Sequence, residues 1–234
     1  MKRVLVSDSM ASEVVEILNN APGIKVEVKT NLKPEELKAV IKDYDALIVR
    51  SSTKATAEII EAATKLAAIG RAGAGVDNID IPAASKRGIV VMNTPGGNTV
   101  TTAEHAIAMM LSLARRIPQA TASMKAGKWE KSKFMGNEYC NKTLGVIGLG
   151  RVGSIVADRA HGLKMNVIAH DPFISPDVAE QMGIALASLD EIYEKADFIT
   201  VHSPLSKETR NLVDDKAFAK MKKGVFLIHC ARGG

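Results

Sequence analysis

Three glycines and one acidic residue have the spacing of a site for a dinucleotide. Gly148, Gly150 and Gly153 form the pattern Gly-x-Gly-x-x-Gly, and Asp171 follows 18 residues after the last of them. The first glycine permits a tight turn, the second lets a pyrophosphate approach the backbone, and the third allows a helix to pack closely. Free N–H groups at the start of that helix favour a phosphate. Asp171 can accept hydrogen bonds from a ribose and would repel a 2′-phosphate, so the pattern favours NAD over NADP.

The elements around this motif fit that chemistry. The apolar run 144–147 predicts a strand before the glycines, residues 151–161 predict a helix after them, and a second apolar run, 166–169, leads to Asp171. In the alternative interpretation the glycines only shape a turn and Asp171 is a solvated strand end. That alternative requires three glycines and an acid to coincide within one strand–helix–strand unit.

Two polar stretches in the first half of the chain indicate a site for an anion. Residues 49–53 (VRSST) and 70–78 (GRAGAGVDN) each follow an apolar run. In open parallel sheets, ligands bind outside the carboxyl ends of the strands. Arg50 could form a bidentate pair with a carboxylate or phosphate, and Gly73 to Gly75 would leave backbone N–H groups open to an anion. Taken alone, either stretch is explained by a surface arginine or a tight turn. The presence of both stretches in one sheet favours the binding of an anion.

The order of the elements predicts an α/β fold with two doubly wound parallel-sheet lobes. Helical segments separate short apolar runs in the first ninety residues, which predicts a parallel sheet covered on both faces. Its first strand is followed by Ser7-Asp8-Ser9 and no glycine pattern, so we expect the cofactor in the second lobe. Pro and Gly within 93–98 predict a linker, with domains at 1–97 and 98–234. A long helix is expected from Thr102 to Arg116, with residues 99–102 as its cap.

Composition narrows the class of partner. The chain has 234 residues and a net charge of +5, but the basic residues are dispersed and only 4% of residues are aromatic. This pattern indicates small anionic ligands and no nucleic acid. We expect no membrane span and no leader, because no apolar run is long enough and the first residues are strand-like. Cys140 and Cys230 are far apart and near no metal-type cluster, so we expect no metal and a cytoplasmic protein with reduced thiols.

Together the motifs identify a resemblance. The chain resembles the D-isomer-specific 2-hydroxyacid dehydrogenases along its whole length. The segments that carry the resemblance are VRSSTK (49–54), GRAGAGVDNID (70–80), NTPGGNTVTTAEHAIAMMLSLAR (93–115), GKWEKSKFMG (127–136), KTLGVIGLGRVG (142–153), HDP (170–172), DFITVHSPL (197–205) and KKGVFLIHCARGG (222–234).

The resemblance implies a fold, a reaction and a set of site residues. It implies a flavodoxin-like substrate-binding lobe followed by a Rossmann NAD-binding domain that is incomplete at its C-terminal end. The phosphoglycerate branch of the family implies NAD-dependent oxidation of 3-phospho-D-glycerate to 3-phosphohydroxypyruvate, the first step of serine biosynthesis. Arg232 would be the catalytic residue, holding the substrate's α-carboxylate and carbonyl oxygen. The implied substrate-binding residues are Arg50, Ser51, Gly73 and Gly75. The implied cofactor-binding residues are Ala74, Gly148, Gly150, Arg151, Val152, Gly153, Asp171, Pro172, His202, Ser203, Pro204, Cys230, Ala231 and Arg232.

Two alternatives to this activity stay open. One is another D-2-hydroxyacid dehydrogenase that acts on hydroxypyruvate, glyoxylate or lactate. The other is a protein that binds NAD without catalysis, either a fragment or a corepressor-like relative. The second gains support because the family's catalytic glutamate and histidine would lie beyond Gly234, so we expect a chain truncated at its C-terminus. His229 stands where the family usually has asparagine, and by position neither it nor His202 is the catalytic histidine.

The resemblance also bears on assembly. The helix expected at Thr102 to Arg116 and the polar loop around Trp129 make a homodimer or homotetramer plausible. Lys131 or Lys133 in that loop would then reach the substrate phosphate of a neighbouring subunit.

Overall fold

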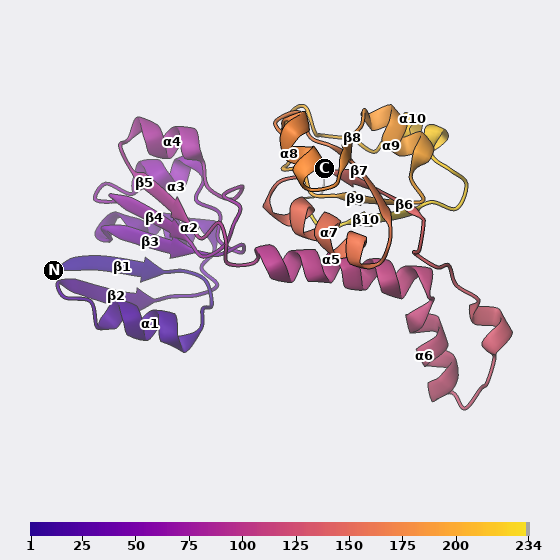
Figure 1. Cartoon of the computed structure of the whole chain (residues 1–234). Helices are drawn as coiled ribbons and strands as arrows, with labels where there is room; N and C mark the ends of the chain where they lie inside the picture. The colour runs from indigo at the N-terminus through magenta and orange to yellow at the C-terminus, as the bar shows by residue number, and fades with distance from the viewer. Residues whose placement is uncertain (233–234) are drawn as a thin grey trace. The chain divides into compact units, whose positions relative to one another are not determined.

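The computed structural model describes residues 1–232. Its contacts divide the chain after Asn98, within the segment that contains Pro95, Gly96 and Gly97, into two compact units. Gly233 and Gly234, which end the last of the motifs, lie outside the described residues. Figure 1 shows a sheet flanked by helices in each unit. The expected α/β fold with two parallel sheets is confirmed.

The first unit is built on a five-stranded parallel sheet of order β2-β1-β3-β4-β5, the flavodoxin-like order. Its strands are β1 (Lys2–Val6), β2 (Ile24–Val28), β3 (Ala46–Val49), β4 (Ala68–Arg71) and β5 (Val90–Asn93). Its helices are α1 (Ser12–Asn19), α2 (Pro34–Val40), α3 (Ala57–Ala62) and α4 (Ile81–Lys86), with a 3₁₀ turn, η1, at Ile41–Asp43. Because the order reverses beside β1, right-handed crossovers place α1 on one face and α2, α3 and α4 on the other.

The second unit contains a five-stranded parallel sheet of order β10-β9-β6-β7-β8, the Rossmann arrangement around β6. Its strands are β6 (Thr143–Ile147), β7 (Asn166–His170), β8 (Ala185–Leu186), β9 (Phe198–Val201) and β10 (Phe226–His229). Its helices are α5 (Thr99–Ala114), α6 (Ile117–Lys125), α7 (Arg151–Gly162), α8 (Pro176–Gln181), α9 (Leu189–Lys195) and α10 (Asp215–Lys220), with a 3₁₀ turn, η2, at Lys131–Phe134.

Buried apolar side chains hold each sheet to its helices. In the first unit Leu5, Leu47 and Ile69 from the strands pack with Ile60 of α3. In the second unit one cluster joins the sheet to α5 and α7, and another joins it to α9 and α10.

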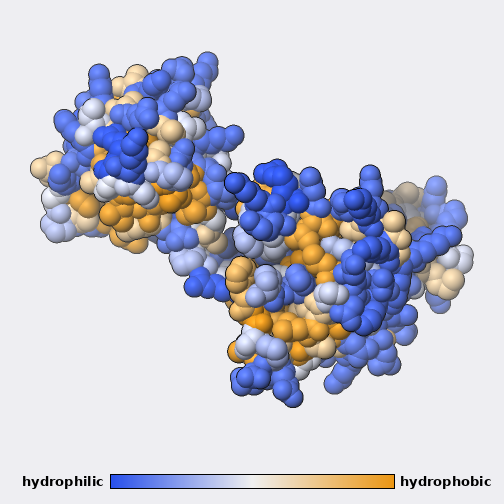
Figure 2. All heavy atoms as spheres, turned by 90° about the horizontal axis from the view of Figure 1, so that it is seen from above, coloured by the Kyte–Doolittle hydropathy of each residue, from blue (hydrophilic) through white to orange (hydrophobic). Residues whose placement is uncertain are grey.

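On the face drawn in Figure 2, hydrophilic side chains cover much of both units, and apolar side chains gather in patches on each. Within residues 1–232, no helix combines the length and the apolar character needed to cross a membrane.

The long helix differs from the prediction at both ends. It begins at Thr99 and ends at Ala114, whereas residues 102–116 were expected, so the threonines predicted as a cap lie inside its first turn. The buried stripe of α5 begins at Ala103, inside the expected range, and α5 contacts α7, so the three additional residues at its start lie outside this packing. The end is set by Arg116, whose left-handed backbone (φ 53°) separates α5 from α6.

Candidate functional site

Strand pairing in the second unit gathers the predicted cofactor residues at one edge of the sheet. The last residue of β6, Ile147, pairs with His170 of β7 and with Val201 of β9. Val201 in turn pairs with His229 of β10. The segments that begin at Gly148, Asp171, His202 and Cys230 therefore all leave the sheet at its carboxyl edge. This is the edge where ligands of open parallel sheets bind.

The three glycines form the turn between β6 and α7. Gly148 has φ 91°, a backbone conformation that residues with a side chain rarely adopt, and a Cβ there would lie 2.7 Å from the backbone N of Ser203. A Cβ on Gly153 would lie 2.0 Å from the carbonyl oxygen of Gly148. A Cβ on Gly150 would meet nothing within 4 Å. Packing of the turn thus requires Gly148 and Gly153, whereas Gly150 keeps an open space at the start of α7.

Asp171 is bonded to the glycine turn itself. One carboxylate oxygen accepts a hydrogen bond from Leu149 N at 2.8 Å, and the other accepts one from Phe173 N at 2.9 Å. The acid therefore holds the turn in addition to any role toward a ligand, which spacing in the sequence did not reveal. Each carboxylate oxygen can accept a further hydrogen bond, so the group remains able to receive ribose hydroxyls.

His202 is an uncharged residue of this edge. Burial, with a smaller contribution from the nearby His229, lowers the pKa of His202 to about 4. Its Nε2 lies 2.9 Å from the hydroxyl of Thr200. His229 Nε2 donates to the carbonyl oxygen of Arg232 at 3.0 Å, since that oxygen can only accept. Both imidazoles are thus engaged within the protein.

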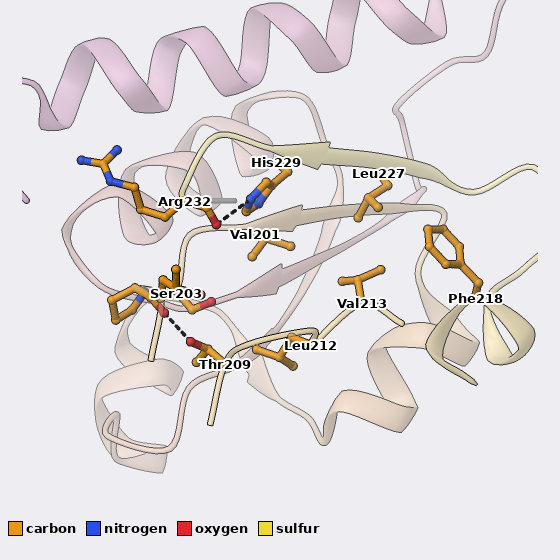
Figure 3. A pocket seen from close by; sticks show the side chains of 11 residues that line it. Val201, Ser203, Thr209, Leu212, Val213, Phe218, Leu227, His229 and Arg232 are labelled. Atoms are coloured by element: carbon orange, nitrogen blue, oxygen red, sulfur yellow. Dashed lines mark hydrogen bonds between the residues drawn. The ribbon is translucent and has the colours of Figure 1, made fainter. Parts of the chain in front are cut away.

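A cavity of about 240 Å³ adjoins the segments after β9 and β10 (Figure 3). Ser203, Pro204 and Arg232, all predicted cofactor residues, line it together with mainly apolar side chains such as Val213 and Leu227. In Figure 3 the guanidinium of Arg232 extends away from these apolar side chains. Gly148, Gly150 and Asp171 do not line this cavity, but Gly148 lies against Ser203, which does.

The glycine turn fits the diphosphate of a dinucleotide. In the same unit, side chains of Ser175, Ser188 and Asp214 cap α8, α9 and α10, whereas the N-cap residue of α7 is Gly150, which has no side chain to do so. The first N–H groups of a helix lack acceptors within the helix, and a phosphate oxygen satisfies them. The space beside Gly150 leaves that position open. The turn would hold the pyrophosphate and Asp171 would hold the ribose.

The first unit presents its own cavity at the carboxyl edge of its sheet. It has a volume of about 410 Å³, and its lining includes Arg50 and Gly73 but not Ser51 or Gly75. Its remaining lining residues are Met10, Ala11, Val14, Ala72, Thr94, Gly97 and Asn98. Two of the four predicted substrate residues are thus brought together. Ala74, predicted to bind the cofactor, belongs to this unit, where its carbonyl oxygen accepts from Asn93 Nδ2 at 2.7 Å.

The sequence prediction missed a polar network beneath this cavity. Asp8, only 5% exposed, accepts hydrogen bonds from Arg50 N at 2.5 Å and from the hydroxyl of Thr53 at 2.7 Å. Asn78 donates to the carbonyl oxygens of Arg50 and Thr53 at 2.7 and 2.6 Å. The position of Asp8 just after the first strand is a signal for it in the sequence, although no glycine pattern accompanies it.

The loop around Trp129 lies apart from the carboxyl edge of its own sheet (Figure 1). Trp129 is 79% exposed and borders a cavity of about 220 Å³ with residues of α6 and η2. Helix α6 has no buried residue, and Figure 1 shows it projecting from the end of α5, away from the sheet of its unit. Lys133 pairs with Glu130 at 2.6 Å. This helix and loop thus form an arm with little packing against the rest of its unit.

Comparison with known proteins relates this chain to one protein family. Residues 107–234 match the family described as D-isomer specific 2-hydroxyacid dehydrogenase, NAD binding domain. The chain is 54% identical over 99% of its length to a D-3-phosphoglycerate dehydrogenase of Archaeoglobus fulgidus, but it covers only 44% of that relative. The curated relatives of this kind are thus more than twice as long as the part they share with it.

Solved structures agree with this match. The NAD⁺-bound 3-phosphoglycerate dehydrogenase of Entamoeba histolytica is similar with a TM-score of 0.80 and 36% identity, over 99% of this chain and 72% of that one. The D-lactate dehydrogenase of Aquifex aeolicus, in complex with NAD and lactic acid, is similar with a TM-score of 0.89 and 29% identity, over 98% of this chain and 69% of that one. The second unit is an NAD-binding domain, as expected, and the chain belongs to the D-isomer specific 2-hydroxyacid dehydrogenases.

Proposed function

We propose that this chain forms the substrate- and NAD-binding part of an enzyme that oxidises 3-phospho-D-glycerate to 3-phosphohydroxypyruvate. The observation that carries the proposal is the 54% identity to a D-3-phosphoglycerate dehydrogenase over 99% of the chain, which includes both units. Arg50 in the cavity of the first unit supports the proposal, because a substrate with a carboxylate at one end and a phosphate at the other needs cationic partners. The cytoplasmic location expected from the sequence belongs to this proposal, in agreement with two free cysteines.

The residues have separate tasks in this proposal. NAD, when bound, accepts the hydride from C2 of the substrate. Arg232 holds the α-carboxylate and the oxygen on C2, which orients the substrate and stabilises the charge that grows there in the transition state. Arg50 and the backbone of Gly73 to Gly75 hold the other anionic end. Arg232 is exposed, which leaves its guanidinium accessible to a ligand.

Neither His202 nor His229 carries the hydroxyl proton in this proposal. His202 is held uncharged by burial, with its pKa lowered to about 4, and its Nε2 is engaged with Thr200. His229 donates to the backbone at Arg232. The proposal therefore assigns proton transfer to a group other than His202 and His229.

Assembly as a homo-oligomer is a further part of the proposal. The arm formed by α6 and η2 exposes Ile117, Met124, Trp129 and Met135, at 49, 55, 79 and 80%. A second copy of the chain would cover this apolar surface and bring Lys131 or Lys133 toward its substrate phosphate. In the oligomer each arm would thus serve the neighbouring site.

The catalytic assignment is tested with Arg232→Ala in a protein that carries this chain at the length of its curated relatives, called below the full-length protein. Loss of one charge-stabilising donor should lower turnover by roughly 10²- to 10³-fold. The control is Arg210→Ala. Arg210 is a cation of the same unit, and it lines neither the cavity of the first unit nor that of the second. Unchanged turnover in Arg232→Ala would refute the role of Arg232.

A further inference from the structure

One side chain joins the two loops at the carboxyl edge of the first sheet. The first loop, Arg50–Thr53, follows β3, and the second, Ala72–Asn78, follows β4. Asn78 Nδ2 donates to the carbonyl oxygen of Arg50 at 2.7 Å and to that of Thr53 at 2.6 Å. On the other side of the carboxamide, Oδ1 accepts from Arg71 Nε at 3.0 Å. Asn78 thus contacts both ends of the first loop and the residue from which the second begins.

The chemistry of these contacts requires a carboxamide. The two carbonyl oxygens need donors, and Arg71 Nε needs an acceptor, so the orientation of the amide of Asn78 is fixed by its partners. A carboxylate would keep the acceptor but remove both donors. A methyl group would remove all three hydrogen bonds.

The contact with Arg71 extends to the glycines of the second loop. Arg71 is 7% exposed, and a Cβ on Gly73 would lie 2.2 Å from its Nη1. The guanidinium therefore fills the space behind Gly73. By holding Nε, Asn78 fixes the side chain on which this part of the loop rests.

Asp8 holds the opposite side of the first loop. Its carboxylate accepts from Arg50 N at 2.5 Å and from Thr53 N at 3.1 Å, while Asn78 binds the carbonyl oxygens of the same two residues. The backbone at Arg50 is thus fixed on its N–H side and on its C=O side. The side chain of Arg50 is exposed at the cavity, with one hydrogen bond from Nη1 to Ser9 O at 3.3 Å.

We propose that Asn78 is a positioning residue for the anionic substrate, because its carboxamide fixes Arg50 relative to the loop of Gly73 to Gly75. The inference rests on the proposed function and adds to it a residue that acts through Arg50. Backbone hydrogen bonds already join the two segments, from Ala55 N to Asn78 O at 2.8 Å and from Ala72 N to Val49 O at 2.9 Å. The side chain of Asn78 therefore sets the alignment of the loops beyond what the sheet requires.

The test uses Asn78→Asp and Asn78→Ala in the full-length protein, with Asn19→Ala, an exposed helix residue of the same unit, as control. Asn78→Asp keeps an acceptor for Arg71, so the fold has a partner for that buried cation, but it loses both donors to the first loop. KM for 3-phosphohydroxypyruvate should rise about tenfold in both variants, since misplacement of a binding group by a fraction of an ångström has effects of this size. KM for NADH should stay within about twofold, as expected when a change acts on one ligand only.

A double variant separates positioning from general destabilisation. In an Arg50→Ala background, Asn78→Ala should raise KM for the acid less than it does in the wild-type protein, because most of its effect passes through Arg50. Additive effects, an equal rise in KM for NADH, or no rise at all would overturn the inference.

Hydrogen exchange keeps this test independent of the proposed function. Amides of residues 50–53 should exchange faster in Asn78→Asp than in Asn19→Ala, with no ligand present. If the wild-type protein turns over no 2-oxo acid but this exchange increases, the proposed substrate fails and the positioning of the loop stands. Unchanged exchange would overturn the positioning role whatever the activity.

Discussion

The turn between β6 and α7 allows one prediction to be worked out in detail, because its glycines differ in what surrounds them. In Gly153→Ala the new methyl group would lie 2.0 Å from the carbonyl oxygen of Gly148, so the turn must move by about 1 Å to restore van der Waals contact. Such overpacking costs typically about 1–3 kcal/mol, against a gain of roughly 0.5–1 kcal/mol from the higher helix propensity of alanine. We expect a net loss of about 1–2 kcal/mol in the free energy of unfolding.

Gly150→Ala should behave in the opposite way. Its methyl group would meet no protein atom within 4 Å, and φ at this position is −70°, which alanine adopts without strain. Stability should therefore be unchanged or slightly higher. The methyl group would instead occupy the space of the pyrophosphate, and each displaced hydrogen bond to a charged group is worth about 1.5–3 kcal/mol, so Kd for NAD should rise roughly 10- to 100-fold.

Gly162→Ala is the matched control, because it lies at the end of the same helix and its methyl group would also meet nothing within 4 Å. It should change the free energy of unfolding by no more than about 1 kcal/mol, and it should leave NAD binding unchanged. Chemical denaturation and titration calorimetry on the three variants measure both quantities. Tight NAD binding by Gly150→Ala would refute the placement of the pyrophosphate, and wild-type stability of Gly153→Ala would refute the packing argument.

Three further predictions concern other parts of the second unit. Asp171→Asn retains an acceptor for Leu149 N, so the fold should persist. Kd for NAD should rise about tenfold, and the preference for NAD over NADP should relax. An unchanged preference in parallel titrations of the two cofactors would exclude a contact of Asp171 with the ribose. The folded protein keeps His202 neutral down to a pKa of about 4, whereas an unfolded histidine titrates near 6.5, so unfolding takes up a proton between these values. Stability should be full above about pH 6.5 and fall by up to about 3 kcal/mol toward pH 4, a slope that denaturation of His202→Gln should lack. Trp129→Ala should weaken self-association in sedimentation velocity, and an unaltered oligomer would exclude Trp129 from the interface.

Much of the fold followed from local sequence signals. Apolar runs predicted the positions of β1, β3, β6 and β7, and the glycine spacing located the turn before α7, because each of these depends on residues adjacent in the chain. The end of the long helix was misplaced because the left-handed backbone at Arg116 has no strong local signal. The two-residue strand β8 was not predicted, since its pairing with β7 is non-local and its apolar run is too short.

The site could be predicted only as far as ligands demand particular residue types. Gly148, Gly150 and Asp171 were predicted as site residues because a pyrophosphate and a ribose require them at fixed spacing. The contact of Asp171 with Leu149 N and the links from Asn78 to Arg50 were not, because they depend on how separate strand ends meet. The reason for Gly153 was also incomplete, since the atom nearest to its missing side chain belongs to the turn at Gly148 and not to the body of the sheet.

The most direct test of the proposed function is oxidation of NADH by the full-length protein with 3-phosphohydroxypyruvate and, in parallel, with unphosphorylated hydroxypyruvate and pyruvate. The reaction is followed by the loss of NADH absorbance. The account predicts turnover with a kcat/KM at least about tenfold higher for the phosphorylated acid, the effect of one additional ion pair of about 1.4 kcal/mol. Equal or higher kcat/KM for an unphosphorylated acid would contradict the assignment of the substrate, and no turnover with any of the three would contradict the proposed reaction.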